Sequence, residues 1–102
     1  MANDASGHGA WVAEVIVVPK PGVNDPQGEA IRGGLGSLGY SGVQRVRSGR
    51  FFRVELTAIN EAAAHTDATA MCERLLSNPV IETYSFSLFP GGGQRAETGE
   101  ES

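Results

Sequence analysis

The stretch Trp11-Val12-Ala13-Glu14-Val15-Ile16-Val17-Val18 decides the fold that this chain is expected to adopt. Successive side chains of a strand point to opposite faces of the sheet. Both faces of this stretch are apolar: one carries Trp11, Ala13, Val15 and Val17, and the other carries Val12, Ile16 and Val18. A strand that is apolar on both faces is typical of the centre of a covered sheet. We therefore predict a central strand over residues 11–18.

Two helices are predicted on either side of a hairpin. Asp25-Pro26 is a helix start signal, and Gly39 follows the apolar stripe of Ile31, Leu35 and Leu38 as a C-terminal cap. Asn60 is placed to cap a second helix over residues 61–76, which Asn78-Pro79 ends. The buried stripe expected on this helix consists of Ala64, Ala68, Met71, Cys72, Leu75 and Leu76.

The remaining strands complete a recognisable order. Residues 43–47 and 50–56 are expected to form a hairpin joined at Ser48-Gly49, and residues 80–89 a last strand. The order βαββαβ predicts an α+β, ferredoxin-like sandwich with a four-stranded antiparallel sheet and two helices on one face. The open face would keep Val12, Ile16 and Val18, and we expect a second copy of the chain to cover them as a homodimer.

Length and charge limit the function classes. The 102 residues allow one domain, which we place at residues 11–89, with disordered tails at 1–10 and 90–102. The net charge of −4 disfavours nucleic-acid binding. No apolar run is long enough to span a membrane, and residues 1–10 lack the pattern of a signal peptide, so we expect a cytoplasmic protein.

The motifs with catalytic precedent have structural interpretations that fit better. Gly34 to Gly39 matches G-x-G-x-x-G, but it closes a helix instead of opening one after a strand. Cys72 stands alone, seven residues from His65, and is expected to be a buried core residue rather than half of a Cys/His pair. No residues have the spacing of a metal site. We expect no catalytic residue and no metal ligand in this chain.

Two polar segments have both a functional and a structural interpretation. The stiff loop Lys20 to Gly28 leads into a capped helix N-terminus, which could hold an anion or could simply connect strand and helix. Four arginines, Arg45, Arg47, Arg50 and Arg53, could contact an acidic partner, or could protect a sheet edge from aggregation.

Several short blocks resemble one family in their order and spacing. The chain is similar to PurS, the small subunit of phosphoribosylformylglycinamidine (FGAM) synthase. The matching residues are Lys20-Pro21-Gly22-Val23, Asp25-Pro26-Gln27-Gly28, Leu38-Gly39-Tyr40, Val46-Arg47 with Gly49, Cys72-Glu73 with Leu75-Leu76, and Asn78-Pro79-Val80-Ile81-Glu82.

The resemblance implies a subunit without an active site of its own. In that family the large subunit activates the substrate amide with ATP and Mg²⁺, and a glutaminase subunit releases ammonia. The small subunit, as a homodimer or possibly a tetramer, bridges the two and helps the ammonia to pass. This chain is then expected to bind no cofactor.

The resemblance also suggests which residues meet partners. For contacts with the two larger subunits we expect Lys20, Pro21, Gly22, Asp25, Gln27, Arg47, Arg50 and Asn78. An alternative function is a free-standing small-molecule sensor with its ligand near residues 33–39. A minimal RNA-binding module that uses Phe51 and Phe52 is a third, weaker alternative.

Overall fold

The computed structural model describes residues 9–91. The elements in chain order are β1 (Gly9–Pro19), α1 (Pro26–Ser37), β2 (Arg50–Ala58), α2 (Glu61–Met71), the π-helical segment η2 (Cys72–Leu76) and β3 (Glu82–Pro90). β1 begins two residues before the predicted domain boundary, and β3 ends one residue after it. The predicted disorder of residues 1–8 and 92–102 lies outside the described residues. No helix within residues 9–91 has the length and apolar character needed to cross a membrane.

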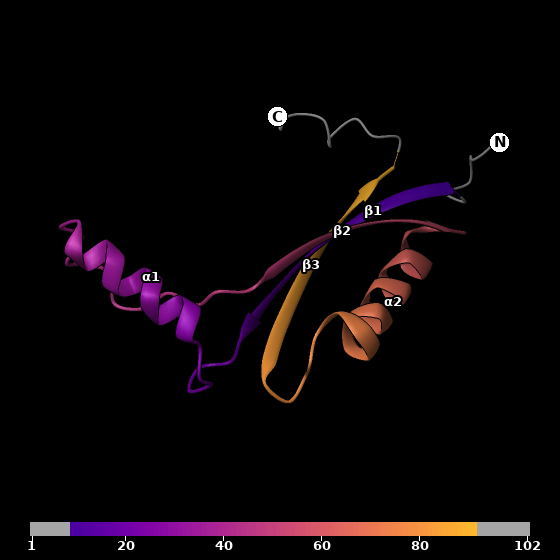
Figure 1. The fold of residues 1–102 in the computed structure, drawn as a ribbon. Helices are drawn as coiled ribbons and strands as arrows, with labels where there is room; N and C mark the ends of the chain where they lie inside the picture. The colour runs from indigo at the N-terminus through magenta and orange to yellow at the C-terminus, as the bar shows by residue number, and fades with distance from the viewer. Residues whose placement is uncertain (1–8, 92–102) are drawn as a thin grey trace.

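The sheet has β1 at its centre, as the sequence predicts. The strand order is β2-β1-β3, and both pairs are antiparallel (Figure 1). Val15 lies opposite Phe52 on one side and opposite Phe86 on the other. This register places the apolar side chains of all three strands on the same face.

The core lies between that face and α2. Ala13, Val15 and Val17 of β1 are buried against Ala68 of α2 and Cys72 of η2. Small residues on α2 let the helix approach the sheet closely, and each fully buried valine contributes about 1.5–3 kcal/mol. Packed around this centre are Phe52, Val54, Leu56, Leu76, Tyr84, Phe86 and Leu88.

The predicted four-stranded sheet is wrong, because residues 43–49 form no strand. Ser48 donates its backbone N–H to a side chain, the Asp25 carboxylate, at 2.9 Å, and not to a neighbouring strand. Gly49 lies so close to β1 that a Cβ there would collide with the Val17 carbonyl oxygen. This segment therefore leads into β2 from the side of α1, and the predicted hairpin does not form. Its two valines offer too little apolar surface to hold an edge strand against the sheet.

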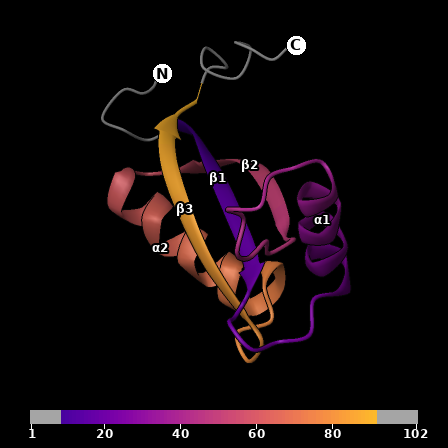
Figure 2. The ribbon, with the colours of Figure 1, turned by 90° about the vertical axis from the view of Figure 1, so that its left-hand side faces the viewer.

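The expectation of two helices on one face is also wrong. α2 packs on the sheet, whereas α1 extends away from it as an arm (Figures 1 and 2). Since α1 does not cover the sheet, Ile31 is 41% exposed and Leu38 is 74% exposed.

The predicted ends of both helices are confirmed. Asp25 caps α1 by accepting the Gly28 N–H at 3.0 Å, and Asn60 caps α2 by accepting the Ala63 N–H at 2.8 Å. Gly39 has φ of +101°, and Tyr40 donates its N–H back to the Leu35 carbonyl at 3.0 Å, as in a Schellman motif.

The second helix changes its hydrogen-bonding pattern at Cys72. Ser77 donates its N–H to the Cys72 carbonyl, five residues earlier, at 2.9 Å. This wider turn rotates Leu75 out of the buried stripe on which it was predicted, and its side chain is 83% exposed.

Candidate partner-binding site

Three connecting segments meet at the end of the sheet where β1 stops. The Lys20 N–H donates to the Ile81 carbonyl at 2.9 Å, which joins the loop after β1 to the turn before β3. Arg47 donates from Nη1 to the Pro19 carbonyl at 3.3 Å, which joins the segment before β2 to the same loop. The structure thus brings together Lys20, Arg47 and the turn that contains Asn78, which were predicted to contact partners from distant parts of the sequence.

Asp25 ties the base of the α1 arm together. Its Oδ1 accepts from the Gly28 N–H, and its Oδ2 accepts from the Ser48 N–H at 2.9 Å. A Cβ at Gly28 would collide with this carboxylate and with the Val46 carbonyl, so only glycine fits here. The carboxylate of Asp25 is therefore engaged within the chain. Gln27, in the first turn of α1, is exposed.

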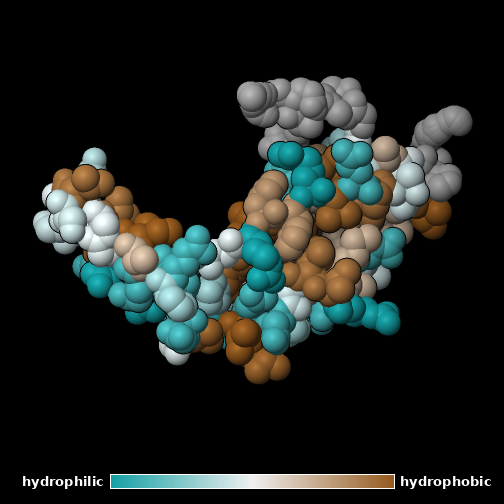
Figure 3. Space-filling model, in the orientation of Figure 1, coloured by the Kyte–Doolittle hydropathy of each residue, from teal (hydrophilic) through white to brown (hydrophobic). Residues whose placement is uncertain are grey.

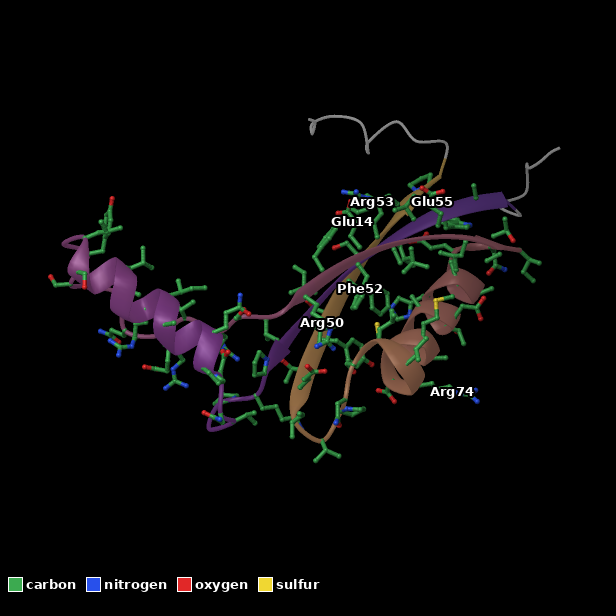
Figure 4. All side chains as sticks on the ribbon, in the orientation of Figure 1. Glu14, Arg50, Phe52, Arg53, Glu55 and Arg74 are labelled. Atoms are coloured by element: carbon green, nitrogen blue, oxygen red, sulfur yellow. The ribbon has the colours of Figure 1, made fainter. Side chains whose placement is uncertain are left out.

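Arg50, at the start of β2, is held by a bidentate ion pair. Its Nη1 and Nη2 each lie 2.9 Å from an oxygen of Glu82, and Nη2 also donates to the Leu76 carbonyl at 3.0 Å. The guanidinium lies 5.9 Å from the centroid of the Phe52 ring (Figure 4). Arg50 thus fastens the start of β2 to the end of η2 and the start of β3.

The same ion pair changes the protonation behaviour of Glu82. The hydrogen bonds from Arg50, followed by the N–H of Asn78 at 2.7 Å, lower the pKa of this carboxyl below its ordinary value. The reciprocal hydrogen bond raises the pKa of Arg50. The sequence analysis missed Glu82 as a partner of Arg50, because the two residues are 32 positions apart and only the β2-β1-β3 order brings them together.

The turn before β3 presents apolar side chains to solvent. The Asn78 side chain accepts from the Val80 N–H at 3.1 Å and so shapes the turn. Val80 is 80% exposed and Ile81 is 42% exposed. Figure 3 shows an apolar patch at this turn, along the lower edge of the molecule. An exposed apolar turn beside the cations Lys20 and Arg47 is a surface suited to protein contact.

A cavity of about 370 Å³ lies between the loop after β1 and the segment before β2. Residues 19–25, 29 and 44–47 line it. The predicted contact residues Lys20, Pro21, Gly22, Asp25 and Arg47 all belong to this lining.

The opposite face of the sheet carries the residues predicted for the homodimer. Val12, Ile16 and Val18 alternate with the residues buried under α2 and so share the face that α2 leaves open, but Val12 is itself buried and only Ile16 and Val18 are accessible there. Ile16 is 50% exposed, and Phe51, its partner on β2, is 52% exposed.

An ion pair crosses the same open face. Arg53 donates from Nε to Glu14 at 3.2 Å, and its guanidinium lies 5.4 Å from the centroid of the Phe51 ring. In Figure 4, Glu14, Arg53 and Glu55 point away from α2, whereas Phe52 points toward it. The open face therefore combines apolar side chains with a polar pair.

The residues considered for catalysis do not form a site. Cys72 is fully buried, and burial raises the pKa of its thiol, which opposes formation of a reactive thiolate. The His65 ring packs against Phe86 with 5.0 Å between centroids. Within residues 9–91, no group of three or more His, Cys, Asp or Glu residues is placed to hold a metal ion. Gly33, Gly34 and Gly36, near the proposed sensor site, face open space.

Comparison with known proteins identifies the family. The family model PurS, described as phosphoribosylformylglycinamidine (FGAM) synthase, matches residues 12–90. The PurS subunit of this synthase from Synechocystis is 43% identical over 79 residues, which cover 78% of this chain and 79% of the relative. The PurS subunit from Bacillus subtilis is 42% identical over 80 residues, covering 76% and 92% of the two chains.

Solved structures agree with the sequence comparison. PurS from Thermus thermophilus has a TM-score of 0.72 at 36% identity, over 80% of this chain and 98% of that one. A chain of the PurLQS structure from Thermotoga maritima has a TM-score of 0.70 at 30% identity, over 78% and 98%. The resemblance that the sequence motifs suggested is confirmed: this chain belongs to the PurS family of phosphoribosylformylglycinamidine synthase.

Proposed function

We propose that this chain is the small, non-catalytic subunit of FGAM synthase in purine biosynthesis. The observation that carries the proposal is the match of the PurS family model over residues 12–90, almost the whole described part of the chain. The synthase converts formylglycinamide ribonucleotide to FGAM with ATP and glutamine. A relative of this chain has been solved in a structure named PurLQS, which supports an assembly with larger subunits.

In this proposal the chain bridges the synthetase and glutaminase subunits and assists the transfer of ammonia between them. ATP and Mg²⁺ belong to the large subunit, and this chain binds no cofactor. The docking residues are those that meet at the end of the sheet, where the loop after β1 adjoins the exposed Val80 and Ile81. We place this reaction, and the chain with it, in the cytoplasm.

We further propose that two copies pair through surfaces that one copy leaves open. Ile16 and Phe51 lie opposite each other on the open face, and each is about half exposed. The apolar stripe of α1 is also without cover from its own sheet, with Leu38 74% exposed. Burying these surfaces against a second copy is favourable at about 25 cal/mol per Å² of apolar area. A tetramer would bury more of this exposed apolar surface between copies in the same way.

Activity measurements test the bridging role. The large synthetase and glutaminase subunits are assayed with glutamine, with and without this chain, and in parallel with ammonia. We expect the chain to restore the glutamine-dependent reaction and to leave the ammonia-dependent reaction nearly unchanged. A glutamine-dependent reaction that proceeds equally well without the chain would contradict the proposed function.

Sedimentation equilibrium tests the pairing. Ile16→Glu places a charge on the open face and is expected to shift the chain toward a monomer. Leu75→Glu is the matched control, because Leu75 is exposed away from that face and should tolerate the charge. If both variants retain the mass of the unmodified oligomer while folded by circular dichroism, the open face is not the interface.

A further inference from the structure

The cations of this chain are unevenly paired. Arg32, Arg50 and Arg53 each form an ion pair with a carboxylate at 2.9–3.2 Å. Within the described part of the chain, the side chains of Lys20 and Arg45 have no such partner, and Arg47 donates to a carbonyl oxygen. These three cations line the cavity between the loop after β1 and the segment before β2, whereas Arg74 of η2, which also has no ion pair within residues 9–91, lies outside it. Three cations without a carboxylate partner are thus gathered at one cavity of a chain whose net charge is −4.

The carboxylates at the same cavity are already engaged. Asp25 accepts hydrogen bonds from two backbone N–H groups, and Glu29 forms an ion pair with Arg32 at 3.0 Å. They therefore leave Lys20, Arg45 and Arg47 available to an anionic group from outside the chain. Two guanidinium groups are suited to hold oxyanions because each can donate two parallel hydrogen bonds.

The form of the cavity favours a carboxylate over a phosphate. A phosphate site at a helix N-terminus uses the free N–H groups of the first turn. Here the Asp25 carboxylate already accepts the Gly28 N–H, so this donor is not free for a phosphate. A carboxylate does not need that helix donor, because a guanidinium group can hold it through two parallel hydrogen bonds.

The surroundings of the cavity indicate that the carboxylate belongs to a protein. The loop that lines the cavity is joined to the turn before β3 by the hydrogen bond from Lys20 to Ile81. That turn exposes Val80 and Ile81, an apolar surface that a small soluble anion would leave in water. An acidic side chain with apolar neighbours on its own chain would fill the cavity and cover the turn together.

We propose that this cavity receives an acidic side chain, flanked by apolar residues, from a larger subunit of the synthase. The inference rests on the proposed function, since it names the chemistry by which the chain docks. The contact lies at the rim of the molecule, so the three cations act mainly through electrostatic attraction. Binding should therefore weaken as salt concentration rises.

Binding of the full chain to each purified larger subunit, measured by biolayer interferometry at two salt concentrations, tests the proposal. The double variant Lys20→Glu, Arg45→Glu reverses two cavity charges whose side chains make no ion pair within residues 9–91. Arg74→Glu is the control, because Arg74 is an exposed cation of η2 outside the cavity. We expect the double variant to bind one larger subunit at least tenfold more weakly and with a smaller salt dependence. The control should stay within twofold of the unmodified chain.

Several outcomes overturn the inference, and they separate it from the proposed function. Equal binding by the double variant and the unmodified chain would show that the cavity does not contribute to docking. The proposed bridging role would not be affected by that result. Failure of the unmodified chain to bind either larger subunit would refute both. Inorganic phosphate is titrated in parallel by NMR. Saturable shifts at the cavity, absent from the double variant, would show a phosphate site instead. A folded spectrum of each variant is required, and the neutral pair Lys20→Gln, Arg45→Gln replaces any variant that fails to fold.

Discussion

The ion pair between Arg50 and Glu82 should make a measurable contribution to stability, and a double-mutant cycle isolates it. The cycle compares Arg50→Ala, Glu82→Ala and the double variant with the unmodified chain. Glu82 also accepts the Asn78 N–H, and Arg50 also donates to the Leu76 carbonyl. Each single substitution therefore removes a further hydrogen bond in addition to the ion pair. The coupling energy removes these additional contacts from the comparison.

The geometry sets the expected magnitude. Exposed ion pairs couple by about 0.2–1 kcal/mol. This pair is bidentate, with both distances at 2.9 Å, and the Glu82 side chain is only 13% exposed while that of Arg50 is 48% exposed. We therefore expect a coupling near the top of that range, about 1 kcal/mol. Arg50→Ala alone should cost about 2 kcal/mol, since it also loses a hydrogen bond to a carbonyl and the contact with the Phe52 ring.

Urea unfolding followed by circular dichroism measures the four free energies. All variants are compared at one protein concentration, because association would itself raise the apparent stability. The cycle of Arg53 and Glu14 is the matched control, since that pair has a single hydrogen bond at 3.2 Å and should couple by only about 0.3 kcal/mol. A coupling between Arg50 and Glu82 that does not exceed this control would refute the role assigned to the bidentate pair.

Three further predictions concern pH, the helix cap and a close backbone contact. Because the pKa of Glu82 is lowered in the folded chain, its ionised form stabilises the chain above the ordinary carboxyl pKa of 4.5. This stabilisation is lost as the pH falls through the lowered pKa. The urea midpoint of the unmodified chain should therefore fall more steeply toward acid than that of Glu82→Gln. Parallel pH profiles would contradict this. Asp25→Ala leaves two backbone N–H groups without their acceptor and should lower the local stability of α1 by about 1–2 kcal/mol. Amide hydrogen exchange should become faster in α1 but not in β1. An equal change in both elements would show that the effect is not local. Gly49→Ala should lower the thermal midpoint, because its Cβ would collide with the backbone of β1. The Cβ of Gly33→Ala meets open space, and this substitution should raise the stability of α1 by up to about 1 kcal/mol. Calorimetry that shows the same shift for both variants would count against the close contact at Gly49.

The local features of this chain could be read from its sequence. The caps of α1 and α2 were predictable because Asp25 and Asn60 each accept an N–H only three residues away. The central position of β1 was predictable because both of its faces are apolar. Gly39 likewise predicted the end of α1, where the backbone takes a positive φ. Each of these signals depends on a few neighbouring residues.

The arrangement of the docking end was decided only in three dimensions. Residues 43–47 were expected to pair with residues 50–56, yet a strand needs a neighbouring edge, and here the segment lies beside α1 instead of in the sheet. The partners Arg50 and Glu82 meet because β2 and β3 flank the same central strand. The cavity forms because one carboxylate, that of Asp25, binds both the start of α1 and the backbone of Ser48, 23 residues away. Sequence periodicity determines which face of a strand or helix is apolar, but tertiary structure decides what meets that face, because the free energy of a long-range contact depends on both of its partners.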